Sequence, residues 1–367
     1  MHIVAVNLEI GLGHPNYLDY VIQALQHQAL KINIKYLDVI NYGPVQSQLF
    51  WQISKRVYCI GARGGFYTHI YNKIRSLDIG SGYNIYRQLS IDADIILVSH
   101  PLLAQNLRGR VWYIHGEIAV PKECAVYNVE KIIVPLNQTK ERLIALGVKP
   151  ENLLVTGLLI SSELTNNAEE VFNKRLLRIK SANPLTIGFF ISGAYPKPHI
   201  EKIIAGISSA IKENNRVIVF IGIDRKKAKD FLKQLNRIQI KGDRPKTPIL
   251  FIQGKNRLDY EKRINRFLPL LDIFVAASHE HTNWAVGLGL PMFAPFPMIG
   301  SYAEENFQFA QKQGVVFPLQ TIADAKNLGK TVSELRGSGI LLKMVENGFG
   351  KFSIDGATKS AQAIINK

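Results

Sequence analysis

Short apolar segments alternate with helical patterns along most of this chain, and this alternation is the feature that most limits its fold. The segments expected to form strands are Ile3–Val6, Ile32–Leu37, Ala93–Ser99, Val111–Ile114, Ile132–Val134, Asn152–Thr156, Leu185–Ile191, Arg216–Ile221, Pro248–Ile252, Asp272–Ala276 and Met292–Ala294. A strand followed by a helix and then by another strand is typical of a parallel sheet. The sequence therefore predicts an α/β protein with parallel sheets.

The length of the chain predicts two domains, because 367 residues are too many for one typical hydrophobic core. A polar and charged stretch after residue 160 marks the expected junction. We expect a Rossmann-like domain at residues 1–160, a linker at 161–184, a second Rossmann-like domain at 185–350 and a terminal helical segment at 351–367. Closing helices are expected at Ser333–Asn347 and Asp355–Asn366.

Composition and charge narrow the class of protein. The chain opens directly on a strand and has no run of eighteen apolar residues, so neither a signal peptide nor a membrane span is expected. Two cysteines, Cys59 and Cys124, fit a reducing compartment. The net charge of +16 suits nucleic acid or anionic lipid, but no nucleic-acid-binding motif is present. A generally basic proteome would explain the charge equally well.

The first predicted strand runs into Gly11-Leu12-Gly13-His14 and then into a helix. Glycines let the backbone approach a ligand closely, and a strand, a glycine turn and a helix open a Rossmann-like unit. The GxGxxG fingerprint is incomplete, so support for dinucleotide binding is weak. His14 either takes a proton from a ligand hydroxyl at neutral pH or merely caps the helix.

The stretch at residues 49–77 mixes aromatic side chains, among them Trp51, Phe66 and Tyr67, with five lysines and arginines. Aromatic rings and cations together suit a membrane interface with anionic lipid. An ordinary pair of packed helices with solvated lysines is the alternative. Further along, His100, His115 and Glu117 follow two predicted strands, where ligand sites form in open α/β sheets. A loop salt bridge would also explain Glu117.

Two loops of the second half are candidate phosphate sites. The first contains Ser192, Gly193 and Lys197 and leads into a helix whose N–H groups suit an anion. A plain turn with a surface lysine is the alternative, and Lys226 and Lys227 are expected to face solvent. The second loop contributes polar candidates for the same ligand, namely His279, His281, Thr282 and Asn283. The HxH pattern also suggests a metal, but no third ligand is evident, so no metal is expected.

A Pro- and Gly-rich loop after Met292–Ala294 delivers two carboxylates and an amide, Glu304, Glu305 and Asn306, to a helix start. Hydroxyl-binding groups beside a helix start that can hold phosphate suit a nucleotide sugar.

This region resembles the donor end of GT-B glycosyltransferases. The similarity is to the family-28-like branch that contains monogalactosyldiacylglycerol synthase, processive diacylglycerol glucosyltransferases and the peptidoglycan lipid-intermediate N-acetylglucosaminyltransferase. It rests on Gly289-Leu290-Pro291, on Glu304-Glu305-Asn306 and on Gly314. The chain departs from that branch in its donor loops, which have lost glycines, and at Trp284, which stands where the branch has a ribose-binding Glu.

The resemblance implies two Rossmann-like domains with parallel sheets that face a cleft, and a last helix that packs back on the first domain. It implies an inverting, metal-independent hexosyltransferase that moves a sugar from a nucleotide-diphosphate donor, UDP-linked by analogy, to a hydroxyl acceptor. His14 would be the base, and the histidines of the second loop would offer N–H donors to phosphate. Gly11, Gly13, Trp51, Phe66, Tyr67, His100, His115 and Glu117 would form the acceptor side.

These implications give the main functional hypothesis and two alternatives. In the main hypothesis the acceptor is a lipid, and the protein is cytoplasmic and peripherally bound to an anionic membrane, with glycolipid synthesis as its role. It would need no cofactor beyond the nucleotide sugar as co-substrate, and no nucleic-acid partner. One alternative is a nucleotide-sugar epimerase, which requires buried acid/base carboxylates. The other is a catalytically degenerate GT-B homologue that binds lipid or a partner.

Overall fold

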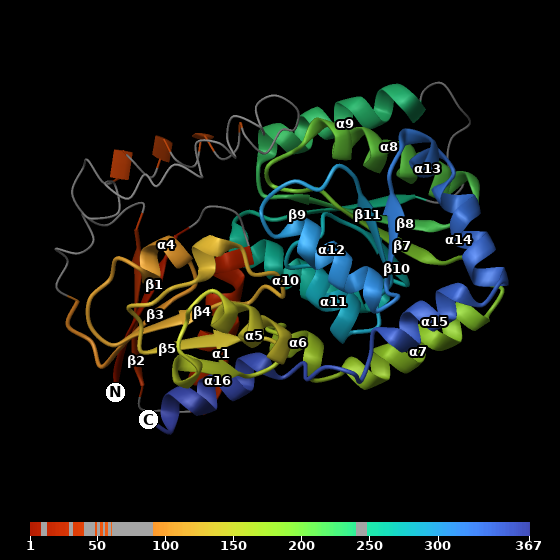
Figure 1. Cartoon of the computed structure of the whole chain (residues 1–367). Helices are drawn as coiled ribbons and strands as arrows, with labels where there is room; N and C mark the ends of the chain where they lie inside the picture. The colour runs from red at the N-terminus through yellow and green to blue at the C-terminus, as the bar shows by residue number, and fades with distance from the viewer. Residues whose placement is uncertain are drawn as a thin grey trace. The chain divides into compact units, whose positions relative to one another are not determined.

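The computed structural model describes residues 1–8, 13–28, 32–39, 48–49, 52–53, 56–57, 60, 91–239 and 248–367. Gly11, Trp51, Phe66 and Tyr67, and most of the aromatic and basic stretch at 49–77, lie outside the described residues. The chain divides into two compact units. Unit 1 denotes the described residues up to Thr165 together with Phe352–Lys367, and unit 2 denotes those of Asn166–Lys351. Both units contain a parallel sheet of six strands (Figure 1).

Unit 1 is built on a sheet in the order β2-β1-β3-β4-β5-β6. Its strands are β1 His2–Asn7, β2 Asn33–Asp38, β3 Ile95–Val98, β4 Val111–Ile114, β5 Lys131–Val134 and β6 Leu153–Val155. Its helices are α1 Gly13–Gln28, α4 Pro101–Ala104, α5 Asn137–Ala145, α6 Ser162–Thr165 and α16 Gly356–Ile365, with short 3-10 turns at Lys122–Cys124 and Pro150–Asn152. Strands β2 and β3 lie on opposite sides of β1, so β1 and β3 flank the point where the strand order reverses.

The end of the chain belongs to the core of unit 1. Ala357, Ala361 and Ile364 of α16 share a buried cluster with α1 and with the central strands. Backbone hydrogen bonds join Leu158 N to the carbonyl of Ser353 at 2.8 Å and Gly356 N to the carbonyl of Leu158 at 3.2 Å. A side chain at position 356 would collide with the carbonyl of Gly157, so this close approach requires glycine.

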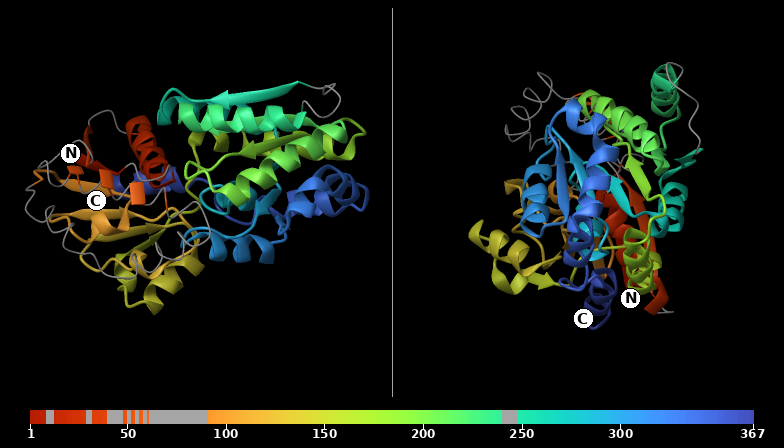
Figure 2. Two further views of the ribbon diagram at one scale, coloured as in Figure 1. Left: turned by 90° about the horizontal axis from the view of Figure 1, so that it is seen from above. Right: turned by 90° about the vertical axis from the view of Figure 1, so that its right-hand side faces the viewer.

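Unit 2 contains the second sheet, in the order β12-β11-β10-β7-β8-β9. Its strands are β7 Thr186–Phe190, β8 Arg216–Gly222, β9 Ile249–Gln253, β10 Ile273–Val275, β11 Met292–Pro295 and β12 Val316–Leu319. Helices lie on both faces of this sheet (Figure 2). They are α7 Ala168–Lys180, α8 Lys197–Lys212, α9 Arg225–Gln239, α10 Arg257–Phe267, α11 Thr282–Gly287, α12 Ala303–Lys312, α13 Ile322–Lys326, α14 Leu328–Gly337 and α15 Ile340–Asn347, with a 3-10 turn at Leu268–Leu270. The switch point of this sheet lies between β7 and β10.

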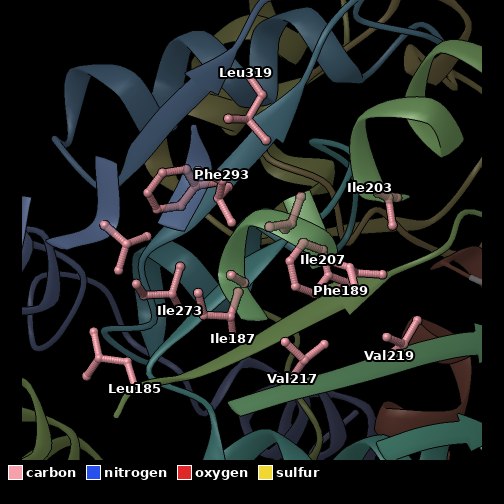
Figure 3. Close-up of a cluster of buried hydrophobic side chains, with 14 of the residues drawn as sticks. Leu185, Ile187, Phe189, Ile203, Ile207, Val217, Val219, Ile273, Phe293 and Leu319 are labelled. Atoms are coloured by element: carbon pink, nitrogen blue, oxygen red, sulfur yellow. The ribbon is translucent and has the colours of Figure 1, made fainter. Parts of the chain in front are cut away.

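The core of unit 2 follows from alternation along its strands. Ile187 and Phe189 point from β7 to the same face of the sheet, and Val217 and Val219 of β8 point with them (Figure 3). Ile207 of α8 fills the space above them. Since β7 is hydrogen-bonded on both sides, all five of its residues are buried, as expected for a central parallel strand.

Helix α7 lies in the stretch predicted as a linker, and a buried arginine joins it to the rest of unit 2. The guanidinium of Arg175 donates to the carbonyls of Leu271, Leu288 and Gly289 at 3.0, 2.6 and 3.0 Å. Burial and the neighbouring Arg178 lower the pKa of Arg175 to about 9. The partners of this arginine lie about a hundred residues further along the chain, so the polar composition of 161–184 could not reveal the helix.

The stretch Ser333–Asn347, predicted to be one helix, belongs to two. Helix α14 ends at Gly337 and α15 begins at Ile340, because Gly339 between them takes a left-handed backbone conformation with φ of 76°. Within the described ranges, no helix is both long enough and apolar enough to cross a membrane.

Candidate functional sites at the carboxyl ends of the two sheets

The loop between β7 and α8 forms one side of the switch point in unit 2. Gly193 is exposed, and a side chain added there would meet nothing within 4 Å. Its carbonyl accepts a hydrogen bond of 2.5 Å from Lys227 Nζ. Ser192 Oγ accepts a bond of 3.3 Å from Ala194 N. Tyr195, which closes the loop, has φ of 57°, a left-handed conformation that is uncommon outside glycine and costs energy.

Lys227 was expected to face solvent, and this expectation was wrong. Its side chain is only 28% exposed because the ammonium group reaches back from α9 to the loop at Gly193. Lys197, predicted as a phosphate ligand, has a side chain that is 85% exposed and lies 3.9 Å from the carboxylate of Glu201. The cation that holds this loop is therefore Lys227 of α9, and not Lys197 at the start of α8.

The loop between β10 and α11 forms the other side of the same switch point. Ser278 and Thr282 are buried, and their Oγ and Oγ1 atoms have no hydrogen-bond partner. The Nδ1 atom of His281 is likewise buried without a partner. Buried polar atoms in native proteins are nearly always paired, so a group of three in one loop indicates a place for a ligand or ordered water. Asn283 is buried beside them, and its backbone N–H bonds to the carbonyl of Glu280 at 3.1 Å.

The third loop, between β11 and α12, is held by side chains of α8. His199 bonds to the carbonyl of Pro297 at 2.8 Å, and Lys202 Nζ donates to the carbonyls of Phe296 and Gln320 at 2.5 and 2.7 Å. Burial lowers the pKa of His199 to about 4 and also lowers the pKa of Lys202. Sequence reasoning missed both residues. Their spacing of three on one helix, close after a strand, was the available signal.

The predicted hydroxyl-binding residues of α12 have different surroundings. Glu304 is exposed and accepts a bond of 2.9 Å from Gln308, and Glu305 is half-buried. Asn306 is fully buried, and its Nδ2 donates to the carbonyl of Ser278 at 3.3 Å. Asn306 therefore joins α12 to the loop of Ser278. His279 belongs to the loop of Ser278, and its ring bonds to the backbone of Ile299 in the loop before α12; burial lowers the pKa of His279.

Trp284 occupies the aromatic interior behind this edge. It is 4% exposed and lies 5.4 Å from the ring of Phe190 and 4.7 Å from the ring of His281. The indole therefore packs under the loops, and it offers no carboxylate to a ribose.

The switch point of unit 1 brings together residues that come from different elements. His14 lies in the first turn of α1, and His100 follows β3 and precedes α4. Their rings are 5.3 Å apart in an edge-to-face arrangement. Asn7, the last residue of β1, is buried, and its Oδ1 has no partner. Gly13 begins the helix that carries His14. Polar side chains therefore converge where the strand order reverses.

Two candidate site residues, His115 and Glu117, follow the neighbouring strand β4. His115 is buried, with Nδ1 3.0 Å from the hydroxyl of Tyr113 and Nε2 3.0 Å from the carbonyl of Ala119. Because a carbonyl can only accept, Nε2 carries the proton. Burial lowers the pKa of His115 to about 4, so the ring is a neutral structural group. Glu117 is 5% exposed and lies two residues further on.

Among the described residues, no group of three or more His, Cys, Asp or Glu side chains could hold a metal ion.

No protein-family model matches the chain, and no curated protein matches it in sequence. Solved structures match along its full length. A putative UDP-N-acetylglucosamine 2-epimerase from Listeria monocytogenes superimposes with a TM-score of 0.60 at 12% identity, covering 100% of this chain and 94% of that one. The UDP-GlcNAc 2-epimerase from Neisseria meningitidis, bound to UDP-GlcNAc, gives 0.56 at 14%, covering 100% and 99%. Anabaena Alr3699/HepE in complex with UDP-glucose gives 0.52 at 11%, covering 100% and 99%.

The fold is of the GT-B type. It confirms the predicted α/β class and the two Rossmann-like parallel sheets. The structures from Listeria and Neisseria are named as UDP-N-acetylglucosamine 2-epimerases, and not as members of the lipid glycosyltransferase branch that the sequence resembles. At such low identities the likeness establishes the fold and leaves activity to be argued from the sites.

Proposed function

We propose that the chain binds a UDP-linked sugar at the carboxyl end of the unit 2 sheet and acts on it as a nucleotide-sugar epimerase. The observation that carries the binding proposal is the pair of unpartnered, buried hydroxyls of Ser278 and Thr282 at the switch point. Hydroxyls and backbone N–H groups at a strand-to-helix turn suit phosphate oxygens. The UDP-GlcNAc and UDP-glucose ligands named in two solved structures with the same fold support this choice.

The epimerase chemistry is supported by a buried carboxylate. Inversion of the carbon next to the anomeric centre by proton transfer needs a base that removes its proton as the C1–O bond to the nucleotide diphosphate breaks, so that the electron pair forms a C1–C2 double bond. It also needs an acid that returns a proton to the opposite face as the C1–O bond re-forms. Glu117 is a buried carboxylate at the carboxyl end of β4, and β3, which ends just before His100, pairs directly with β4. A carboxylate in this setting suits general acid/base work. The names of the structural neighbours favour this chemistry over transfer to an acceptor.

Exchange with solvent tests the proposal directly. We expect calorimetry to show that the full chain binds UDP-GlcNAc or UDP-glucose. Incubation of the bound sugar in D2O should then place deuterium on the inverted carbon, as proton NMR would record. If neither UDP nor either UDP-sugar binds at millimolar concentration, the binding proposal fails and the degenerate homologue becomes the better account. Binding without deuterium uptake removes the epimerase assignment alone.

Glycosyl transfer is the second candidate, because of the pair formed by His14 and His100. The His14 ring is half-buried at the start of α1, and a neutral imidazole there could accept the proton of an acceptor hydroxyl. A lipid acceptor and an anionic membrane remain part of this candidate. Radiolabelled UDP-sugar with anionic liposomes would reveal a glycolipid product, and His14→Ala should abolish its formation. Equal transfer by His14→Ala would remove the base assignment.

A further inference from the structure

The ring of His281 lies in an aromatic environment that disfavours a charged imidazole. It is 4.7 Å from the ring of Trp284, 5.0 Å from that of Phe190 and 6.5 Å from that of Phe274. Taking an imidazolium ion out of water costs free energy, and burial lowers the pKa of His281 to about 4. At neutral pH the ring therefore has one N–H donor and one lone-pair acceptor.

The hydrogen bonds of the ring show which nitrogen carries the proton. The ring donates to the backbone carbonyl of Ala277. Since Nδ1 has no hydrogen-bond partner, this donor is Nε2. The buried Nδ1 atom therefore presents a lone pair and can only accept a hydrogen bond.

This protonation state distinguishes His281 from its neighbours in the loop. The hydroxyls of Ser278 and Thr282 are able to donate to phosphate oxygens. A phosphate oxygen at neutral pH is itself an acceptor, so it has no favourable contact with Nδ1 of His281. The unpartnered atoms of the loop thus combine two hydroxyls that can donate with one nitrogen, Nδ1 of His281, that can only accept. Such a combination fits a ligand that places an O–H or N–H group beside its phosphates.

We propose that Nδ1 of His281 accepts a hydrogen bond from a hydroxyl or N–H group of the nucleotide sugar and selects against ligands that offer phosphate alone. The inference rests on the proposed nucleotide-sugar site and assigns it a specificity-determining residue. It reverses the sequence-based expectation that this histidine donates to phosphate. The buried acceptor stays unsatisfied until a donor reaches it, which makes the contact selective.

Two substitutions separate the acceptor from the ring. His281→Phe keeps an aromatic ring against Trp284 and Phe190 and removes the acceptor. His281→Asn loses the ring, but its Oδ1 takes the place of Nδ1 and still accepts. We expect His281→Phe to weaken binding of the tightest UDP-sugar about tenfold, the effect of losing one neutral hydrogen bond. His281→Asn should remain within about twofold of the wild type, because the acceptor is retained.

Inorganic pyrophosphate is the matched probe for the phosphate contacts. Its affinity should be the same in the wild type and both variants. The proposal is overturned if His281→Phe binds the UDP-sugar as the wild type does, if His281→Asn binds it more weakly than His281→Phe, or if pyrophosphate affinity falls in parallel. Melting temperatures of the variants show whether packing alone has changed.

The unliganded protein provides a test that does not need the nucleotide sugar. Imidazole nitrogen NMR of the wild type at pH 7, assigned through His281→Asn, should show the neutral ring with its proton on Nε2. A proton on Nδ1, or on both nitrogens, would overturn the inference even if UDP-sugars bind. Conversely, a failure of all UDP-sugars to bind would refute the proposed function while the NMR result decides the state of His281.

Discussion

Each unit has a six-stranded sheet whose strands are all parallel, but the polar residues at the carboxyl ends of the two sheets differ in kind. In unit 2 the loops are fixed by cations and imidazoles bound to backbone carbonyls, such as Lys202 and His199, and the unpaired atoms are mainly hydroxyls. In unit 1 the corresponding edge presents His14, His100 and Glu117, whose side chains can exchange protons. The carboxyl edge of unit 2 therefore offers mainly hydrogen-bond donors, and that of unit 1 offers groups that can exchange protons.

The largest expected effect would come from Glu117, the acid/base residue of the proposed epimerase. Glu117→Gln keeps the shape of the side chain and removes its basicity, so turnover of the bound UDP-sugar should fall by about 10²- to 10⁴-fold. Its dissociation constant should change by less than about twofold, because the groups proposed to bind the ligand lie in unit 2. Deuterium uptake and calorimetry measure the two quantities. Glu141→Gln, on the exposed face of α5, is the control. A parallel loss of binding would contradict the division between the units.

A stability change confined to unit 2 comes next. Arg175→Met removes a donor from three buried carbonyls, and those of Leu288 and Gly289 lose their bond to a guanidinium while Leu271 keeps one from Arg178. The free energy of unfolding of unit 2 should therefore fall by about 3–5 kcal/mol. Hydrogen exchange resolved by peptide would follow both units in denaturant. Lys174→Met, whose side chain is exposed on the same helix, should cost less than about 0.5 kcal/mol. Equal destabilisation of unit 1 would show that the units do not unfold separately.

Mild acid should destabilise unit 2 more than unit 1. Burial holds the pKa of His199 and of His281 at about 4 in unit 2, whereas in unit 1 the pKa of His115 is lowered in this way. A histidine whose folded pKa lies below its unfolded value gives stability that is present above pH 6.5 and is lost as the pH falls towards 4. For each of these histidines, the free energy of unfolding is expected to fall by about 2 kcal/mol between pH 7 and pH 5. Burial also lowers the pKa of His279, which adds to the acid sensitivity of unit 2. Burial raises the pKa of Glu280, so protonation of this carboxyl in acid stabilises unit 2 and partly offsets the effect of the histidines.

This pH prediction is measured by equilibrating the protein in denaturant at pH 7 or 5 and then labelling it with deuterium at one common pH. His199→Gln should reduce the acid sensitivity of unit 2, since the amide can still donate to the carbonyl of Pro297 and does not titrate. An equal loss of protection in both units would refute the assignment of the buried imidazoles as its cause.

The smallest expected effect concerns the loop at Gly193. Lys227→Met removes the bond that holds the carbonyl of this glycine, so UDP-sugar affinity should fall about tenfold while turnover of the saturated protein is unchanged. Calorimetry of Lys227→Met and of Lys226→Met, its exposed neighbour, makes the comparison. A fall in turnover at saturating substrate would mean that unit 2 also takes part in the chemistry.

Much of the fold was predictable because it depends on local patterns. Apolar runs bounded by turn residues placed strands such as β7 and β8 to within one residue at either end. Helix α7 and the break at Gly339 were not predictable in this way. The first depends on carbonyls supplied from beyond residue 270, and the second on one backbone conformation.

The sequence indicated where the candidate site residues lie more reliably than what each side chain does there. Ser192, Thr282 and His100, chosen as polar residues that follow predicted strands, lie beside the two switch points in the structure. The roles depended on packing. His115 proved to be saturated by hydrogen bonds inside its own unit, and Asn306 proved to connect two loops.

The sequence by itself determined that the chain forms parallel sheets with polar groups at their carboxyl ends, since side-chain periodicity and turn chemistry act over a few residues. Only the tertiary structure decided which of those groups are satisfied. The bond from Lys202 to Phe296 spans 94 positions, and the ring of His281 owes its protonation state to Phe190, Phe274 and Trp284. Hydrogen bonding and burial depend on neighbours in space. Many of these neighbours come from distant parts of the chain, so a short stretch of sequence does not reveal them.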